Sequence, residues 1–224
     1  MGQLTVSGRD TVYVWVGRDT GGQPDPATAL LRRAGALLLG RTRTAVVLTH
    51  DRDGRPVVRV DEVELAVSVS RTAGLVAVAA RPAGPVGVDV ERIRPLPALA
   101  LARRWFPPAE LARLGDRPEA GRAAEFLRLW TAKEAVGKAL GRGLRDGGLR
   151  RLMPPPGLPL RTVPGADALR VGHPQLGRGL VLAVAALATG QVDVEMVRRP
   201  GHGVTAERSA SVERTSLPVV VRGN

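Results

Sequence analysis

Residues 86–91, with the sequence VGVDVE, carry two carboxylates whose spacing allows metal chemistry. Side chains alternate along a β-strand, so the three valines would share one face while Gly87, Asp89 and Glu91 share the other. Two adjacent carboxylates repel each other unless a cation lies between them. Oxygen ligands in a chain without cysteine favour Mg²⁺, Mn²⁺ or Ca²⁺ over zinc. The alternative is an ordinary strand with a solvated acidic face.

A second segment, residues 130–138 with the sequence WTAKEAVGK, places Trp130, Glu134 and Lys138 at helical spacing on one face. Mg²⁺ commonly takes one or two carboxylates together with phosphate oxygens of a substrate, so Glu134 could complete a metal site and Lys138 could neutralise a phosphate. Lys133 and Lys138 are the only lysines among 33 basic residues. Their placement in one short segment is either chance or a sign that a compact ammonium is needed at both positions. The alternative is an amphipathic helix with one Glu–Lys pair and Trp130 in the core.

Together the two segments resemble the signature of the Sfp-type 4′-phosphopantetheinyl transferases. That signature is an apolar-Gly-apolar-Asp-x-Glu strand, a spacer of about forty residues, and then Trp-x-x-Lys-Glu-x-x-x-Lys. Here forty residues separate Asp89 from Trp130. The similarity extends to WFPPAEL at 105–111, to GRGL at 141–144, and back to 54–56 and 67–70, so that it covers roughly residues 28–197.

The resemblance implies an enzyme that moves 4′-phosphopantetheine from coenzyme A to a serine of an acyl or peptidyl carrier protein and releases 3′,5′-ADP. It implies that Asp89, Glu91 and Glu134 hold Mg²⁺ and that Lys138 contacts the pyrophosphate of coenzyme A. Lys133 would support the same region. Glu110 is the candidate base, although a Glu in the first helical turn is also what the helix dipole favours.

The resemblance also points to residues that would grip the 3′-phosphate of coenzyme A, namely Arg55, Ser68 and Arg71. The chain departs from the family pattern here, because relatives usually have Ser-His-Ser where this sequence has Ser68-Val69-Ser70. Valine cannot hydrogen-bond a phosphate, so coenzyme A binding is weakened or its grip shifts onto Arg71. A second hypothesis is therefore a relative that binds coenzyme A or a carrier protein without efficient transfer.

These residues must be positioned by an α+β fold, which the resemblance implies is two similar α/β halves packed as a pseudo-dimer. The periodicity predicts a helix over 25–39, strands within 45–80 and at 86–91, helices over 99–105, 107–114 and 120–140, and strands near 157–163, 180–187 and 192–197. We assign residues 1–84 to an N-terminal half that grips the adenylate end of coenzyme A. Residues 85–197 form a C-terminal half with the metal and pyrophosphate motifs, and 198–224 a disordered tail.

Composition limits the remaining possibilities. With 44% hydrophobic but only 3% aromatic residues, the core must be built from aliphatic side chains. The net charge of +12 favours polyanionic partners, but the chain lacks stacking aromatic residues and known nucleic-acid motifs, so we expect no nucleic-acid partner. Its longest apolar run, 180–189, is too short to span a membrane, and the sequence shows no secretory signal. We expect a cytoplasmic monomer.

Overall fold

The computed structural model describes residues 11–19, 21, 25–157 and 159–188, together with the backbone of strands at 193–197 and 214–217. In chain order the elements are β1 (Thr11–Arg18), α1 (Pro26–Leu38), η1 (Arg43–Ala45), β2 (Val47–His50), β3 (Pro56–Val60), β4 (Val63–Thr72), β5 (Leu75–Arg81), β6 (Val86–Arg92), α2 (Ala98–Trp105), α3 (Pro108–Gly115), α4 (Glu119–Ala139), η2 (Gly148–Arg150), β7 (Arg161–Val163), β8 (Ala166–Gly172), β9 (Leu180–Leu187), β10 (Asp193–Val197) and β11 (Arg214–Leu217). This mixture confirms the predicted α+β class. Among the described helices, none has the length and apolar content to cross a membrane.

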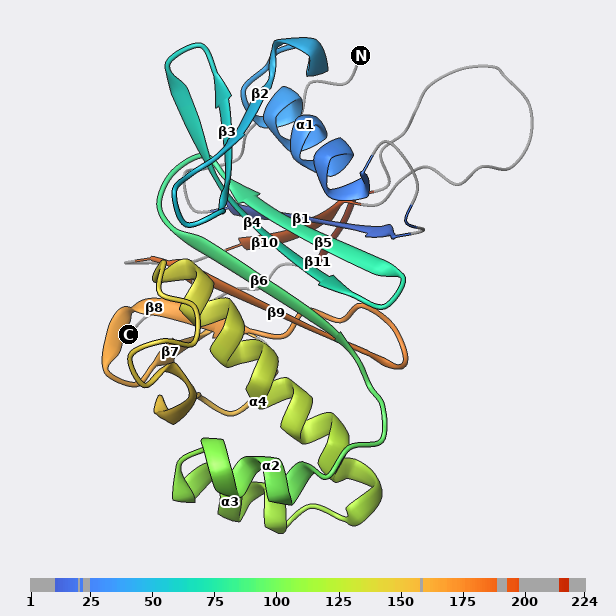
Figure 1. The fold of residues 1–224 in the computed structure, drawn as a ribbon, viewed down its shortest axis with the longest axis vertical. Helices are drawn as coiled ribbons and strands as arrows, with labels where there is room; N and C mark the ends of the chain where they lie inside the picture. The colour runs from blue at the N-terminus through green and yellow to red at the C-terminus, as the bar shows by residue number, and fades with distance from the viewer. Residues whose placement is uncertain are drawn as a thin grey trace, which may run out of the picture.

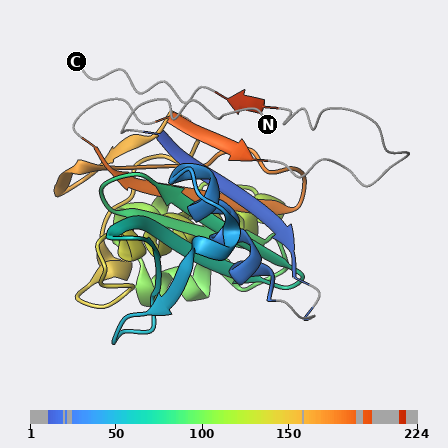
Figure 2. The same cartoon turned by 90° about the horizontal axis from the view of Figure 1, so that it is seen from above.

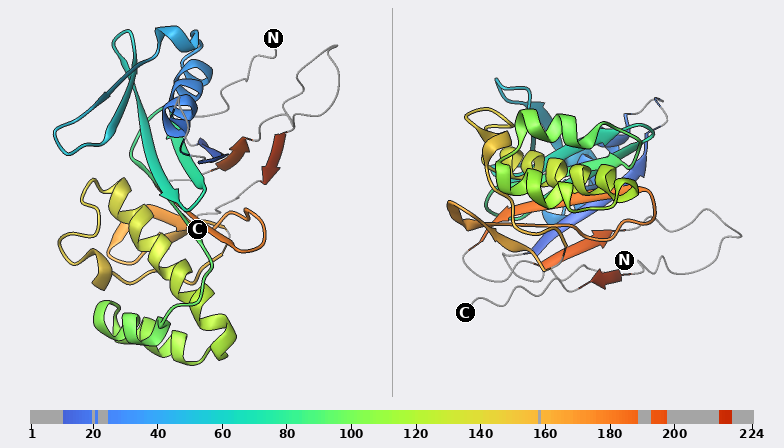
Figure 3. Two further views of the ribbon diagram at one scale, coloured as in Figure 1. Left: turned by 45° about the vertical axis from the view of Figure 1, so that its right-hand side comes forward. Right: turned by 90° about the horizontal axis from the view of Figure 1, so that it is seen from below.

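The strands form two sheets that pack face to face between helices. The first has seven strands in the order β11-β10-β1-β5-β4-β3-β2, and the second has four in the order β6-β9-β8-β7. Neighbouring strands are antiparallel except for β1 and β10, which are parallel. Helix α1 covers the outer face of the first sheet and α4 covers the outer face of the second, while α2 and α3 pack against α4 (Figures 1, 2 and 3).

The alternation of side chains along single strands builds this layered core. In β1, Val12 and Val14 pack between the two sheets, whereas Tyr13 and Trp15 face α1. The valines of β6 enter the same layer between the sheets, as predicted, and meet aliphatic residues of β5 and β9. The opposite face of β9 packs against α4. Because aromatic residues are few, most of this interior is close-packed Val, Leu and Ala.

Helix α1 begins where the sequence predicts it. The Asp25 carboxylate caps the helix by accepting hydrogen bonds from the backbone N–H and the hydroxyl of Thr28, both at 3.0 Å. Pro26 occupies the first helical turn, where its missing N–H costs nothing. The cap therefore fixes the end of α1 that lies beside the candidate site.

Helix α4 lies directly on β6 because Gly87 has no side chain. A Cβ atom at this position would lie 1.9 Å from the Ala135 carbonyl oxygen and 2.8 Å from the Ala139 nitrogen. Backbone atoms of a helix cannot move away from such a contact without shifting the whole element. The glycine thus sets the short distance between the strand and the helix that carry the two sequence motifs.

The structure differs from the sequence-based prediction at four strands, β1, β8, β10 and β11. Strands β1 and β8 were not predicted, and β8 is hard to recognise because polar residues interrupt its apolar pattern. Strand β10 pairs with β1, so it joins the first sheet, whereas the sequence analysis placed residues 192–197 in the C-terminal half; the division into halves stays a prediction. The tail predicted to be disordered contains β11, which pairs with β10, and the rest of 198–224 lies outside the described residues.

A pairing of two similar halves stays a prediction, since one sheet has seven strands and the other four.

We expect Gly87→Ala to destabilise the protein by roughly 3 kcal/mol or more, because overpacking against a rigid backbone forces α4 away from β6. Gly121→Ala is the matched control, since it lies in α4 at a position where an added Cβ atom would have no neighbour within 4 Å beyond its own helical turn. Alanine there should stabilise the helix slightly. Urea denaturation of both variants measures the difference. Equal stability of the two variants would contradict the close contact.

His173, directly after β8, should make stability depend on pH. Its Nε2 lies 2.9 Å from the Arg128 carbonyl oxygen, and its Nδ1 accepts a hydrogen bond from the Gly157 N–H, so the ring is neutral. Burial lowers the pKa of His173 to about 4.

Between pH 6.5 and 4 the unfolded chain binds a proton that the folded chain does not. The free energy of unfolding should therefore decrease as the pH is lowered through this range, by about 3 kcal/mol at most. Chemical denaturation at several pH values checks this. The slope should flatten in His173→Gln and persist in His50→Gln, which changes an exposed histidine. An unchanged slope in His173→Gln would contradict the assignment.

Candidate functional site

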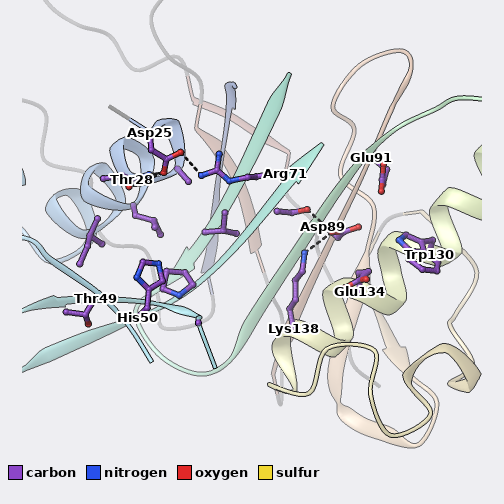
Figure 4. A pocket seen from close by; sticks show the side chains of 17 residues that line it. Asp25, Thr28, Thr49, His50, Arg71, Asp89, Glu91, Trp130, Glu134 and Lys138 are labelled. Atoms are coloured by element: carbon purple, nitrogen blue, oxygen red, sulfur yellow. Dashed lines mark hydrogen bonds and ion pairs between the residues drawn. The ribbon is translucent and has the colours of Figure 1, made fainter. Parts of the chain in front are cut away.

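A pocket of about 690 Å³ opens between the first sheet with α1 and the second sheet with α4 (Figure 4). One wall comes from α1, β2, the turn after β2, and β4, and the other from β6 and α4. It brings together Asp89, Glu91, Trp130, Glu134 and Lys138, the residues predicted from the two motifs. The strand and helix periodicities in the sequence therefore located one face of a single pocket.

Strand β6 lies at the edge of its sheet, and serine hydroxyls from β4 satisfy its outward N–H groups. The N–H of Val88 donates to Ser68 Oγ at 3.1 Å, and the N–H of Val90 donates to Ser70 Oγ at 3.2 Å. An unpaired buried N–H is costly, so these two bonds stabilise the junction between the sheets. Ser68 is buried and does not line the pocket, so the structure gives it a position for joining the sheets rather than for gripping coenzyme A.

Asp89 is the most enclosed of the three predicted metal ligands. Its Oδ1 accepts a hydrogen bond from Ser70 Oγ at 2.7 Å and lies 2.8 Å from Lys138 Nζ. Lys138 also donates to the Val88 carbonyl oxygen at 3.0 Å. Burial raises the pKa of the Asp89 carboxyl, while Lys138 and Ser70 act in the opposite direction. Lys138 therefore compensates part of the negative charge of Asp89 at the pocket wall.

Glu91 and Glu134 extend the acidic surface on either side of Asp89 (Figure 4). Glu91 is held by Thr72 Oγ1 at 3.3 Å and by Arg94 Nη1 at 2.8 Å. Burial first, and then the charges of Asp89 and Glu91, raise the pKa of Glu134. Mutual repulsion of this kind is expected where a cation is to be bound.

The donor chemistry of these side chains fits a hard divalent ion such as Mg²⁺, because the pocket offers three carboxylates and room for water and phosphate oxygens. In the part of the chain that the structure describes, no three acidic or histidine side chains are already gathered closely enough to hold a metal ion. The carboxylates share a pocket, but metal binding requires their side chains to turn toward one another. Metal binding stays a prediction.

Glu110 and Lys133 lie in the core and not along the pocket. Lys133 Nζ lies 2.7 Å from Glu110 Oε2, and Glu110 Oε1 accepts a bond from the Met153 N–H at 2.7 Å. Lys133 also donates to the Arg151 carbonyl oxygen and lies over the ring of Phe106. Both side chains are 2% exposed or less. The structure thus separates them from the other predicted site residues and favours a role in anchoring α3, α4 and the segment around Met153.

The arginines predicted to grip a phosphate are both engaged with the protein. Arg55 lies beside the pocket, and its guanidinium donates to the Gly141 carbonyl oxygen and to Asp53 at 3.2 Å. Arg71 lines the pocket, with Nη1 2.6 Å from Asp19 Oδ2 and Nη2 2.5 Å from Asp25 Oδ1. Val69 lines the same wall, so the departure from the family pattern falls inside the pocket.

Several residues of the site were missed in the sequence analysis. They are the aspartates that hold Arg71, the hydroxyls of Ser70 and Thr72, and Arg94 on Glu91. Alternation along β4 could have indicated Ser70 and Thr72, because Ser68, Ser70 and Thr72 share the face that meets β6. Arg71 and Asp19 are far apart in the sequence, so no local pattern could have indicated that they pair.

Comparison with known proteins matches the same part of the chain. Residues 85–156 match the family model described as the 4′-phosphopantetheinyl transferase superfamily. The 4′-phosphopantetheinyl transferase psf-1 of Bacillus pumilus is 35% identical over 103 residues, which are 46% of this chain and 42% of that protein. The 4′-phosphopantetheinyl transferase HetI of Nostoc sp. is 33% identical over 109 residues, which are 47% of this chain and 46% of that protein.

The chain spans less than half the length of each curated relative it matches, between 25% and 46%. The resemblance recognised in the sequence is confirmed for residues 85–156, which contain Asp89, Glu91, Glu134 and Lys138. Arg71 and the rest of the opposite wall lie outside that match.

The pair of Glu110 and Lys133 should contribute to stability as a unit. Lys133→Met would leave a buried carboxylate without its cation and should cost about 3–5 kcal/mol, whereas adding Glu110→Gln should restore much of that loss. A double-mutant cycle by urea denaturation measures the coupling. The exposed pair of Arg59 and Glu64, 3.2 Å apart, is the control and should couple by at most about 1 kcal/mol. Equal coupling in the two cycles would contradict the structural role.

Proposed function

Because residues 85–156 match the 4′-phosphopantetheinyl transferase model, we propose that this chain transfers 4′-phosphopantetheine from coenzyme A to a serine of an apo carrier protein. The carrier is an acyl or peptidyl carrier protein, and the reaction depends on Mg²⁺. The serine oxygen forms a new bond to the β-phosphorus, and the bond from that phosphorus to the bridging oxygen breaks. The hydroxyl proton is given up, and 3′,5′-ADP leaves with the bridging oxygen.

The observation that supports this proposal best is the joint placement of Asp89, Glu91, Glu134 and Lys138 around one pocket. Displacement at phosphorus needs charge neutralisation and positioning more than covalent help from the protein. Asp89, Glu91 and Glu134 would hold the Mg²⁺, which when bound supplies positive charge to the diphosphate. Lys138 adds a second positive charge from α4.

The proton of the attacking serine needs an acceptor that reaches the pocket. Glu110 is buried against Lys133, so it is poorly placed for this role. Glu134 lines the pocket, but it is also a proposed ligand of Mg²⁺, and a bound cation would favour its charged form and lower its affinity for a proton. A water held by the ion would then be a better acceptor than either side chain.

The charge of the chain is consistent with the proposed carrier-protein partner. A net charge of +12 favours association with an acidic carrier protein, because complementary charge speeds the encounter of two proteins. The position of Val69 in the pocket wall supports the second hypothesis, a relative that binds coenzyme A or a carrier protein without efficient transfer. The two hypotheses differ in whether the carrier gains mass.

The test is incubation of the protein with coenzyme A, Mg²⁺ and apo acyl or peptidyl carrier proteins, followed by mass spectrometry of the carrier. We expect a phosphopantetheine adduct on the carrier serine. Asp89→Asn and Glu134→Gln should each lower the rate by roughly 100-fold or more, because a proposed ligand of the metal is lost.

Glu62→Gln removes an exposed carboxylate from the turn before β4 and should leave the rate unchanged. If coenzyme A binds but none of the carriers gains mass, the binding hypothesis replaces the transferase. If Glu134→Gln and Glu62→Gln transfer equally fast, the site is misassigned.

A further inference from the structure

The charged groups of the pocket fall into two clusters at opposite walls (Figure 4). Asp89, Glu91, Glu134 and Lys138 lie on β6 and α4. Arg71 lies on β4 beside Asp25 at the start of α1. Under the proposed function the first cluster takes the diphosphate, so the ribose and its 3′-phosphate extend along the pocket toward the second.

Arg71 is the one arginine among the described residues that line this pocket, and both terminal nitrogens of its guanidinium already meet a carboxylate. Nη1 lies 2.6 Å from Asp19 Oδ2, and Nη2 lies 2.5 Å from Asp25 Oδ1. Hydrogen bonds and charge from these two aspartates raise the pKa of Arg71, which means that they stabilise its charged form. The positive charge of the guanidinium is therefore already compensated by carboxylates of the protein itself.

Two carboxylates around one guanidinium leave this cluster with a net negative charge. A guanidinium has five N–H groups, so a phosphate could still bond to Arg71, but it would share the charge of Arg71 with two carboxylates that are already bound. Asp19 and Asp25 would lie close to that phosphate and repel it. The neighbouring Val69 offers no hydrogen bond in compensation. The cluster is poorly suited to a strongly charged ligand.

We propose that this pocket discriminates only weakly between donor substrates with and without a 3′-phosphate, because Asp19 and Asp25 occupy Arg71. 3′-Dephospho-coenzyme A should therefore serve nearly as well as coenzyme A. The inference rests on the proposed function for the identity of the donor. It assigns Asp19 and Asp25 as residues that determine specificity through Arg71. They set how much positive charge Arg71 presents to the ribose end of the ligand.

Asparagine can replace either aspartate with little change in local structure. At position 19 an amide oxygen can still accept the bond that Gly21 N–H now makes to Asp19 Oδ1. At position 25 asparagine is as good a helix cap as aspartate, so α1 should still begin at Pro26. Each substitution removes one negative charge from Arg71. Both substitutions should therefore increase the contribution of the 3′-phosphate to the affinity for coenzyme A.

The experiment measures the dissociation constants of coenzyme A and 3′-dephospho-coenzyme A by calorimetry with Mg²⁺ present, and transfer from each donor to an apo carrier protein. For the unmodified chain we expect the two dissociation constants to agree within about threefold. In Asp19→Asn and in Asp25→Asn, coenzyme A should gain roughly tenfold over the dephospho form, because Arg71 becomes available for a charged hydrogen bond. Asp61→Asn, which removes an exposed partner of Arg41 outside the pocket, should leave the ratio unchanged.

The outcomes separate this inference from the proposed function. A preference for coenzyme A above about thirtyfold in the unmodified chain would overturn the inference and leave the transferase intact. The inference would also be overturned if neither Asp19→Asn nor Asp25→Asn changed the ratio, or if Asp61→Asn changed it equally. Equal binding of both donors without transfer to any carrier would overturn the proposed activity and support the weak reading of the 3′-phosphate. Failure of both ligands to bind would overturn both proposals.

Discussion

The candidate site depends on how the edge strand β6 is held between two neighbours. On one side the hydroxyls of Ser68 and Ser70 accept hydrogen bonds from its backbone, and on the other side Gly87 allows α4 to lie against it. An edge strand with free N–H groups would otherwise need water or another strand there. The same contacts aim Asp89 into the pocket, because Ser70 also donates to its carboxylate. Fold and site are thus fixed by the same few groups.

The two lysines of the chain have different environments although they lie five residues apart on α4. Lys133 is fully buried against Glu110, and burial lowers its pKa, an effect that the neighbouring carboxylate opposes. Lys138 lies at the pocket wall beside Asp89 and remains accessible to a ligand. One ammonium therefore stabilises the helix packing, and the other is available for chemistry. A helix places positions 133 and 138 on different faces, which explains the division.

The sequence located the residues that β6 and α4 contribute to the pocket more fully than it located the strands, for a physical reason. Alternation in β6 and helical spacing in α4 are local patterns, so Asp89, Glu91, Trp130, Glu134 and Lys138 could be placed together without coordinates. The positions of Glu110 and Ser68 depended on long-range packing, in which Glu110 meets Lys133 and Ser68 meets the backbone of β6. The return of β10 to β1 is equally non-local. Patterns of spacing give the direction of a side chain but not the element that lies opposite it.

Under the proposed function, the carboxylates of β6 and α4 share one divalent ion with the diphosphate of the ligand. If this is correct, Mg²⁺ and coenzyme A must strengthen each other's binding, since linkage between two ligands is reciprocal. The direct measurement is a calorimetric titration of coenzyme A into the protein, with Mg²⁺ and then with the ion chelated. We expect an affinity at least about tenfold higher with Mg²⁺. Equal affinity under the two conditions would contradict it.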